Sequence, residues 1–180
     1  MNILSQVLVI GTALALGAVA SAGSEHWTLH RLSIDPIRPE NRRIFVGAGE
    51  KIRVEFKNES DREAVKVFPE PPMIVRQVGA RTNCEIDGGV WARDSVYLSA
   101  DEEILLVLEF SGDLNHLVAY DTGNCRKLGD LDVSGGRWSV IGSEIVLGTQ
   151  CRTRDVASCK KKREIPVSKL CNSASGDGNE

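Results

Sequence analysis

The stretch Lys51-Ile52-Arg53-Val54-Glu55-Phe56-Lys57 decides the fold class, because charged and apolar residues alternate along it without a break. Alternation with a period of two is typical of a β-strand that has one face in the core and one face in water. Similar short runs predict strands at residues 27–34, 43–46, 64–68, 90–98, 116–120 and 138–147.

Clusters of Gly, Asn, Asp and Ser separate these runs, at residues 47–49, 87–89, 111–113, 122–124 and 134–136. Such residues supply the backbone conformations that tight hairpins need. Many short strands joined by tight turns predict an all-β fold. We expect a two-sheet antiparallel β-sandwich of immunoglobulin-like architecture.

Residues 99–110 fit two kinds of secondary structure. Ser99 and Glu102 have the capping-box spacing that starts a helix. However, the pattern of residues 44–54 recurs at residues 96–106, as an apolar strand end, a turn containing Ala and Glu, and a new apolar run. Two glycines in the first copy exclude a helix there. By analogy we expect residues 104–110 to be a central strand, buried on both faces, with the two hairpins in equivalent places of two packed sheets.

Residues 1–22 have the pattern of a secretory signal peptide. They carry no charged side chain, residues 7–19 are an apolar run, and Ala20-Ser21-Ala22 forms a cleavage site of small residues. The apolar run is shorter than the ~18 residues of a membrane span, so no membrane span is expected. We therefore expect a secreted or periplasmic protein whose cysteines meet an oxidising compartment.

The length of 180 residues suits one folded domain. A hydrophobic content of 42% and a charged content of 26% exclude a wholly disordered chain. After the signal peptide we expect the β-sandwich at residues 23–150 and a basic, cysteine-containing extension at residues 151–171, tethered by a disulfide. Residues 172–180 are polar and are expected to form a disordered tail.

No cysteine precedes residue 84, and the five cysteines are Cys84, Cys125, Cys151, Cys159 and Cys171. We expect Cys84 to pair with Cys125, and a second bridge to tie the segment of the last three cysteines to itself or to the sandwich. One thiol is left over, either buried or available for an intermolecular bridge. Closely spaced ligand pairs are missing from the sequence, so neither a metal nor another cofactor is expected.

The formal net charge of −3 combines two oppositely charged parts. Residues 152–169 hold seven Lys or Arg against two acids, a net of +5, whereas residues 23–151 hold 15 against 21, a net of −6. The seven basic residues are Arg152, Arg154, Lys160, Lys161, Lys162, Arg163 and Lys169. They predict a binding patch for a protein or for an anionic glycan or lipid surface. Aromatic residues are not interleaved with them, so nucleic acid is not expected.

A second candidate for binding is the proline-rich stretch of residues 68–73. Its apolar residues are Phe68, Pro69, Pro71, Pro72 and Met73. Proline cannot donate a hydrogen bond to a β-ladder, so the stretch is expected to be a loop or a sheet edge. A plain connection between two sheets is the simpler interpretation, and a binding loop is the alternative.

Catalytic motifs are weak. Asp121-Thr122-Gly123 resembles the active-site triplet of aspartic proteases, but the mature chain has one copy, so a catalytic pair would need a homodimer. The same triplet is ordinary turn chemistry after a strand. His116 has no nucleophile or orienting acid at motif spacing.

These observations favour an exported, disulfide-stabilised binding module over an enzyme. Its expected role is that of an inhibitor, an immunity-like protein, an effector or an adhesion module that recognises a macromolecule. Two alternatives remain open. One is a hydrolase whose site assembles only in the fold, around Asp121 or His116, and the other is a structural subunit linked through the spare cysteine.

Overall fold

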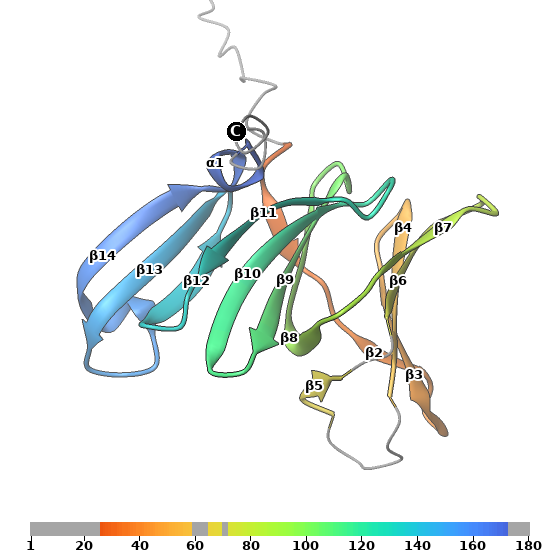
Figure 1. The fold of residues 1–180 in the computed structure, drawn as a ribbon, viewed down its shortest axis with the longest axis horizontal. Helices are drawn as coiled ribbons and strands as arrows, with labels where there is room; N and C mark the ends of the chain where they lie inside the picture. Colours follow the sequence, from red (N-terminus) through yellow and green to blue (C-terminus); the bar gives the residue numbers. More distant parts are fainter. Residues whose placement is uncertain (1–25, 59–64, 70–71, 173–180) are drawn as a thin grey trace, which may run out of the picture.

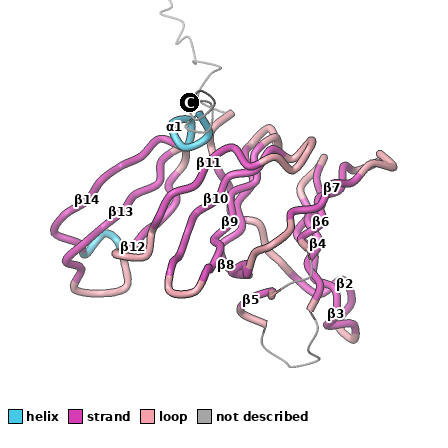
Figure 2. Tube along the Cα trace, in the orientation of Figure 1, coloured by secondary structure: helices cyan, strands magenta, loops and turns pink. Residues whose placement is uncertain are grey.

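The fold was analysed in a computed structural model, which describes residues 26–58, 65–69 and 72–172. The predicted signal peptide, residues 173–180 of the predicted tail and Pro71 lie outside these residues. Strands make up most of the described chain, and Figure 2 shows helix only in a short 3₁₀ turn and near the carboxyl end. No helix in this part of the chain has the length and apolar character of a membrane span.

The strands form three antiparallel sheets (Figure 1). The six-stranded sheet contains β1 (Leu29–Arg31), β8 (Val90–Ser99), β9 (Ile104–Ser111), β10 (Leu114–Asp121) and β11 (Lys127–Asp132) in that order, with β5 (Val67–Phe68) paired to β8. The five-stranded sheet contains β2 (Asp35–Arg38), β3 (Asn41–Ala48), β4 (Ile52–Lys57), β6 (Met73–Gln77) and β7 (Asn83–Ile86). The three-stranded sheet contains β12 (Arg137–Ile141), β13 (Glu144–Cys151) and β14 (Cys159–Pro166). Short helices lie on either side of β14, η1 (Val156–Ser158) before it and α1 (Val167–Asn172) after it.

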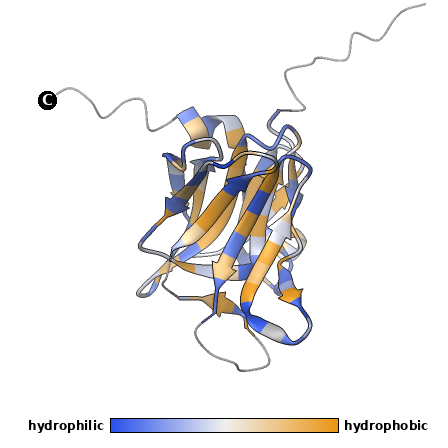
Figure 3. Ribbon diagram, turned by 90° about the vertical axis from the view of Figure 1, so that its right-hand side faces the viewer, coloured by the Kyte–Doolittle hydropathy of each residue, from blue (hydrophilic) through white to orange (hydrophobic). Residues whose placement is uncertain are grey.

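The six-stranded sheet is the middle layer of the molecule and contributes to two cores. Towards the five-stranded sheet it packs in a core that includes Phe56, Phe68 and Trp91. Towards the three-stranded sheet and α1 it packs in a second core that includes Leu117 and Ile145. Figure 3 views the molecule from the side of the five-stranded sheet and shows hydrophobic and hydrophilic bands alternating along several strands. The predicted antiparallel β-sandwich is therefore confirmed, with a third sheet packed on its outer face.

The strand predicted at residues 104–110 is confirmed as β9. It lies between β8 and β10, and its run Ile104 to Leu108 is buried throughout. The two matching hairpins are β3–β4 in the five-stranded sheet and β8–β9 in the six-stranded sheet, as the internal comparison predicted. The capping-box glutamate, Glu102, is not in a helix but in the β8–β9 turn, with a φ of 65°.

The side chain of Glu102 joins the two hairpins. One carboxylate oxygen accepts the backbone N–H of Glu50 at 2.6 Å, and the other accepts the N–H groups of Lys51 and Ile52, each at 2.8 Å. A Cβ atom on Gly49 would lie 2.5 Å from this carboxylate and would force it to move, so glycine at this position leaves room for the contact. A single carboxylate therefore ties the five-stranded sheet to the six-stranded sheet.

A disulfide reinforces the same pair of sheets. Cys84 on β7 is bonded to Cys125 in the turn after β10, which confirms the predicted pairing. The hydroxyl of Thr122 in that turn donates to the carbonyl oxygen of Glu102 at 2.7 Å. The disulfide turn is thus in direct contact with the turn that carries Glu102.

Asp101 precedes Glu102 and fixes the shape of their turn. Its Oδ1 accepts the hydroxyl of Ser99 at 2.6 Å and the N–H of Glu103 at 3.2 Å, and its Oδ2 contacts Nδ1 of His26. Burial raises the pKa of Asp101, but the hydrogen bonds from Ser99, His26 and Glu103 outweigh this effect and bring the pKa below its usual value.

The predicted strand at residues 138–147 is in fact two strands. β12 ends at Ile141 and β13 begins at Glu144, with Gly142 at a φ of 59° in the tight turn between them. Apolar residues lie on both sides of this turn, at Val140 and Ile141 and again at Ile145 to Leu147, so the sequence pattern was interpreted as one long run. The glycine is the signal that separates the two strands.

We expect Glu102→Gln to lower the free energy of unfolding by about 1.5–3 kcal/mol, because a neutral amide accepts fewer and weaker hydrogen bonds than a carboxylate. Urea unfolding followed by tryptophan fluorescence measures this difference. Glu103→Gln is the matched control, because Glu103 is exposed and its carboxylate makes no contact with the β3–β4 turn. Equal stability of the two variants would contradict the role given to Glu102.

We expect Asp101→Asn to be less stable than the natural chain at neutral pH. Because the folded-state pKa of Asp101 is lowered, the ionised carboxylate stabilises the fold at pH values above the ordinary pKa of an aspartate in the unfolded chain. This stabilisation is lost as the pH falls through the folded-state pKa. Thermal unfolding between pH 7 and pH 2 should therefore show a difference in Tm between the variant and the natural chain that becomes smaller in acid. A difference in Tm that stays constant with pH would contradict the stabilising role of the ionised Asp101.

Candidate functional site

Four of the predicted basic residues lie on β14, the strand at the outer margin of the three-stranded sheet (Figure 1). Lys160, Lys161, Lys162 and Arg163 are all exposed. Among the described residues β14 pairs with β13 alone, so its other edge has no strand beside it. The basic cluster therefore coincides with a free sheet edge.

Strand geometry distributes these charges over two faces. Successive side chains of a strand point to opposite sides, so Lys160 and Lys162 lie on one face and Lys161 and Arg163 on the other. The loop with Arg152 and Arg154 lies before the start of β14, and Lys169 lies in α1, after the end of β14. The seven predicted residues thus form a band along the edge of the sheet rather than one compact cluster.

A closed loop positions the two arginines at the start of this band. The disulfide between Cys151 and Cys159 spans the loop, so the expected bridge joins this segment to itself. Inside it, Asp155 accepts the N–H of Ala157 at 2.8 Å, and Ser158 accepts the N–H of Thr153 at 3.0 Å. These bonds hold the loop backbone while Arg152 and Arg154 remain exposed.

The disulfide loop depends on Gly148 of β13. A Cβ atom at this position would clash with the Sγ of Cys159 and would lie 2.9 Å from a methyl group of Val156. Lys162 closes the other side, because its Nζ donates to the carbonyl oxygen of Ala157 at 2.9 Å. The loop and the basic strand are therefore one connected unit.

The charges of this band are not neutralised within the described part of the chain. No ion pair there includes any of the seven basic residues of the predicted patch. Some cations elsewhere are paired, such as Arg76 with Glu55 at 3.2 Å and Lys127 with Asp130 at 3.0 Å. The band is consequently a surface of unpaired positive charge on a molecule with an acidic body.

Arg137 extends the band and was missed in the sequence analysis. It is exposed at the start of β12 and lines a polar cavity of about 360 Å³ together with Gly135, Gln150 and Cys151. It lies outside the window of residues 152–169 that the charge count singled out. The adjacent Gly135-Gly136 turn was the available signal, because a Cβ atom at Gly136 would lie 2.6 Å from the carbonyl oxygen of Gly148, so glycine lets this end of β12 lie against β13 near the disulfide loop.

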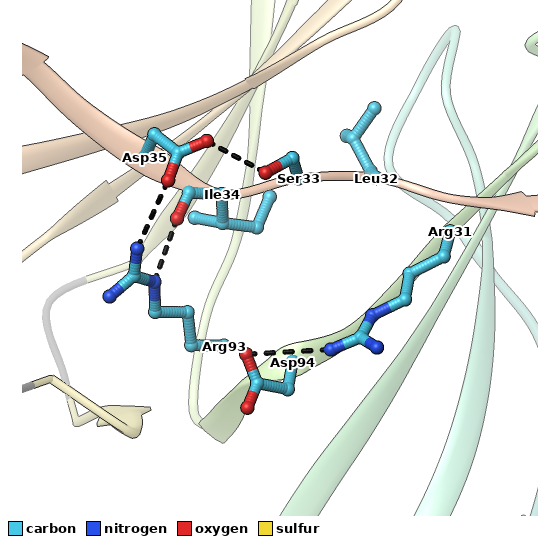
Figure 4. A pocket seen from close by; sticks show the side chains of 7 residues that line it. All are labelled: Arg31, Leu32, Ser33, Ile34, Asp35, Arg93 and Asp94. Atoms are coloured by element: carbon cyan, nitrogen blue, oxygen red, sulfur yellow. Dashed lines mark hydrogen bonds and ion pairs between the residues drawn. The ribbon is translucent and has the colours of Figure 1, made fainter.

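A second cavity, of about 250 Å³, lies where the chain crosses from β1 to β2 (Figure 4). Its charged side chains bind one another. Arg93 pairs with Asp35 at 3.2 Å and donates to the carbonyl oxygen of Ile34 at 2.7 Å, while Arg31 pairs with Asp94 at 3.5 Å. These charges therefore hold the crossing segment in place and leave none unpaired for a ligand.

The proline-rich stretch connects two sheets. Phe68 ends β5 of the six-stranded sheet and Met73 starts β6 of the five-stranded sheet. Phe68 is 1% exposed and Met73 is 0% exposed, so both are core residues and do not offer an apolar surface to a partner. Of the remaining candidates, Pro69 is exposed, Pro72 is half-buried and Pro71 lies outside the described residues.

Both catalytic candidates have polar contacts in the described part of the chain. Asp121 accepts the N–H groups of Gly123 at 2.8 Å and Asn124 at 3.3 Å, which is the turn chemistry that the sequence allows for this triplet. The Nδ1 of His116 lies 3.2 Å from a carboxylate oxygen of Asp130. These contacts give no support to the hydrolase alternative.

The spare cysteine is Cys171, which lies in α1 and is 8% exposed. It packs in the second core, and burial raises the pKa of its thiol to about 11. A thiol in this environment is protonated at neutral pH and poorly placed for a bridge to another chain. The structure therefore does not favour the alternative of a subunit linked through this cysteine.

One group of side chains in the described residues has the composition of a cation site. It consists of His26, Asp101 and Glu103, whose ligand atoms lie within 4.8 Å of one another. Asp101 already accepts two hydrogen bonds and contacts His26, and the Glu103 side chain is 74% exposed. These contacts account for the cluster as part of the β8–β9 turn.

Comparison with known proteins identifies the family. The family model described as "Immune protein Tsi1" matches residues 28–171, which cover the three sheets and both disulfides. The chain is also 35% identical over 169 residues to the immune protein Tsi1 of Pseudomonas aeruginosa, covering 93% of this chain and 98% of that protein. The chain that carries this exposed, basic and disulfide-closed sheet edge therefore belongs to the Tsi1 immune protein family.

Proposed function

We propose that this protein is an immunity protein that protects its cell by binding and neutralising a toxin protein. Membership of the Tsi1 immune protein family is the observation that carries the proposal. A protein partner is therefore favoured over the glycan or lipid surface, for which the family gives no support. The proposed action is binding alone, as the family membership suggests, and the candidate Asp121 is a turn residue.

We further propose that the toxin contacts the part of the basic band that is made of Arg152, Arg154 and the four cations of β14. Three features support this surface. Its charges are unpaired among the described residues, its loop is closed by a disulfide, and its backbone is fixed by hydrogen bonds. A rigid surface loses less conformational entropy on binding than a mobile one. The acidic body would direct an acidic partner towards this band.

Export is the third part of the proposal. Two disulfides suit an oxidising compartment outside the cytoplasm. The leader-like residues 1–22 provide a route to that compartment. The protein would then meet its toxin in the periplasm of the cell that it protects.

A contact competition between sibling cells tests this function. We expect a strain that lacks this chain to be killed by its parent when both grow in contact. The full chain should restore survival, whereas a chain without residues 1–22 should not, because it would remain in the reducing cytoplasm. Survival of the deletion strain beside its parent would contradict the immunity role, and full rescue by the leaderless chain would contradict export.

A charge variant tests the proposed surface. We expect replacement of Lys160, Lys161, Lys162 and Arg163 by Gln to weaken toxin binding at least tenfold at low salt, and to reduce the salt dependence of the Kd. The matched control replaces four other exposed cations, Arg38, Lys57, Lys66 and Arg81, by Gln. Isothermal titration calorimetry measures the Kd of each variant for the toxin, which is first isolated by its binding to the natural chain. Equal weakening would indicate an effect of net charge alone and would exclude the band as the contact.

A further inference from the structure

The register of β13 and β14 determines which backbone groups of β14 face away from the sheet. The N–H of Val167 donates to the carbonyl oxygen of Ser143 at 2.9 Å, directly beyond the paired residues Glu144 and Pro166. In an antiparallel ladder, hydrogen-bonded and non-hydrogen-bonded pairs alternate. Pro166 has no N–H and so occupies a non-hydrogen-bonded position, which agrees with this alternation.

The alternation continues along the strand with the same register. Residues 161, 163 and 165 then bond to β13, whereas Lys160, Lys162 and Glu164 direct their N–H and C=O groups outwards. These three residues are exposed, and β13 is the only strand in the described part of the chain that pairs with β14. A row of backbone donors and acceptors is therefore open to another strand.

We propose that β14 binds an extended, acidic segment of the protein partner as a fourth strand of the three-stranded sheet. This inference rests on the proposed function and specifies how the basic band engages the toxin. Backbone hydrogen bonds to Lys160, Lys162 and Glu164 provide the docking, and the four cations select the sequence of the segment. Strand addition of this kind is an established mode of peptide recognition.

The charges of β14 explain why the added strand is acidic. Cations lie on both faces of the strand, so an incoming segment meets Lys160 and Lys162 on one face and Lys161 and Arg163 on the other. Directly opposed side chains of unlike charge stabilise a strand pair, and like charges destabilise it. A second copy of β14 is therefore repelled from this edge, while a segment with carboxylates on successive residues is attracted.

The ends of β14 limit the length of the added segment. The disulfide loop with Arg152 and Arg154 lies before the strand, and α1 begins at Val167 directly after it. The exposed run of residues 160–164 accommodates about five residues, or roughly 17 Å of extended chain. The partner then contributes a short strand rather than a long edge.

A pair of substitutions at one position separates backbone pairing from charge attraction. Both Lys162→Gln and Lys162→Pro remove the same charge and the same contact with Ala157, but only the proline removes the outward N–H and places a ring at the edge. A proline whose missing N–H faces solvent is tolerated on an edge strand. Thermal unfolding of both variants verifies that they are folded.

The probe is a synthetic eight-residue peptide of alternating Glu-Glu and Val-Thr pairs, which presents carboxylates on both faces of an extended strand, with a Gln-for-Glu peptide as its neutral control. We expect the acidic peptide to bind the natural chain more tightly than the neutral one. Lys162→Gln should weaken binding about twofold to fivefold, as for one exposed charge pair. Lys162→Pro should weaken it at least tenfold. Glu164→Gln should strengthen it, because a repulsive charge is removed.

Amide hydrogen exchange on the natural chain gives a readout that does not depend on any variant. Added-strand binding should slow exchange at Lys160, Lys162 and Glu164 by at least tenfold, while Thr149 on β13 serves as the internal reference. Each of three outcomes would overturn the inference. These are equal affinity of the natural chain for the two peptides, equal affinity of Lys162→Pro and Lys162→Gln for the acidic peptide, and unchanged exchange at the three amides.

These outcomes are distinct from those of the competition test. A chain that protects cells but shows no amide protection with the peptide overturns strand addition and leaves the immunity function intact. A chain that binds the acidic peptide through its edge but does not protect cells overturns the immunity function instead.

Discussion

The contact on which the arrangement of the first two layers depends is the carboxylate of Glu102, which accepts three backbone N–H groups from the β3–β4 turn. Its residue has a φ of 65°, a conformation that costs a non-glycine residue on the order of 1–3 kcal/mol. Three charge-assisted hydrogen bonds offset that cost. Around this contact lie the Cys84–Cys125 disulfide, the Thr122 hydroxyl and the Asp101 carboxylate. One end of the sandwich is thus fixed by polar contacts, and the rest of the interface between the two sheets is held by apolar packing.

The middle sheet links this rigid end to the proposed binding surface. Because β9 is buried on both faces, the sheet that carries Glu102 also supports the second core beneath β13 and α1. The three-stranded sheet packs on it with one face only, and its last strand remains free at the margin (Figure 1). The molecule therefore combines a well-anchored interior with one open edge, and this edge carries unpaired positive charge.

Sequence patterns predicted the parts of the fold that have a clear period or a repeated motif. The alternation at Lys51 to Lys57 identified β4, and the repeated hairpin identified β9 against the signal of the capping box. β6, β11 and β14 had no such signal. β6 buries three consecutive residues after the prolines, β11 contains a glycine and three charges, and β14 is exposed from Lys160 to Glu164. The charge count found the basic residues, but only the strand pairing shows that four of them occupy a free sheet edge. Similarly, no periodicity in the sequence reveals the contact between Glu102 and a turn 50 residues away.

The burial of Cys171 has a consequence for how the disulfides form. Five thiols allow fifteen ways to make two bridges, and a wrong choice would trap the chain. Cys151 and Cys159 are separated by 8 residues, so their encounter has a low entropic cost compared with the 41-residue separation of Cys84 and Cys125. Cys171 is the last of the five, and docking of α1 withdraws it into the second core. In an oxidising compartment, the packing of this short helix would keep the thiol of Cys171 away from wrong pairings, and Leu170 is buried in the same core.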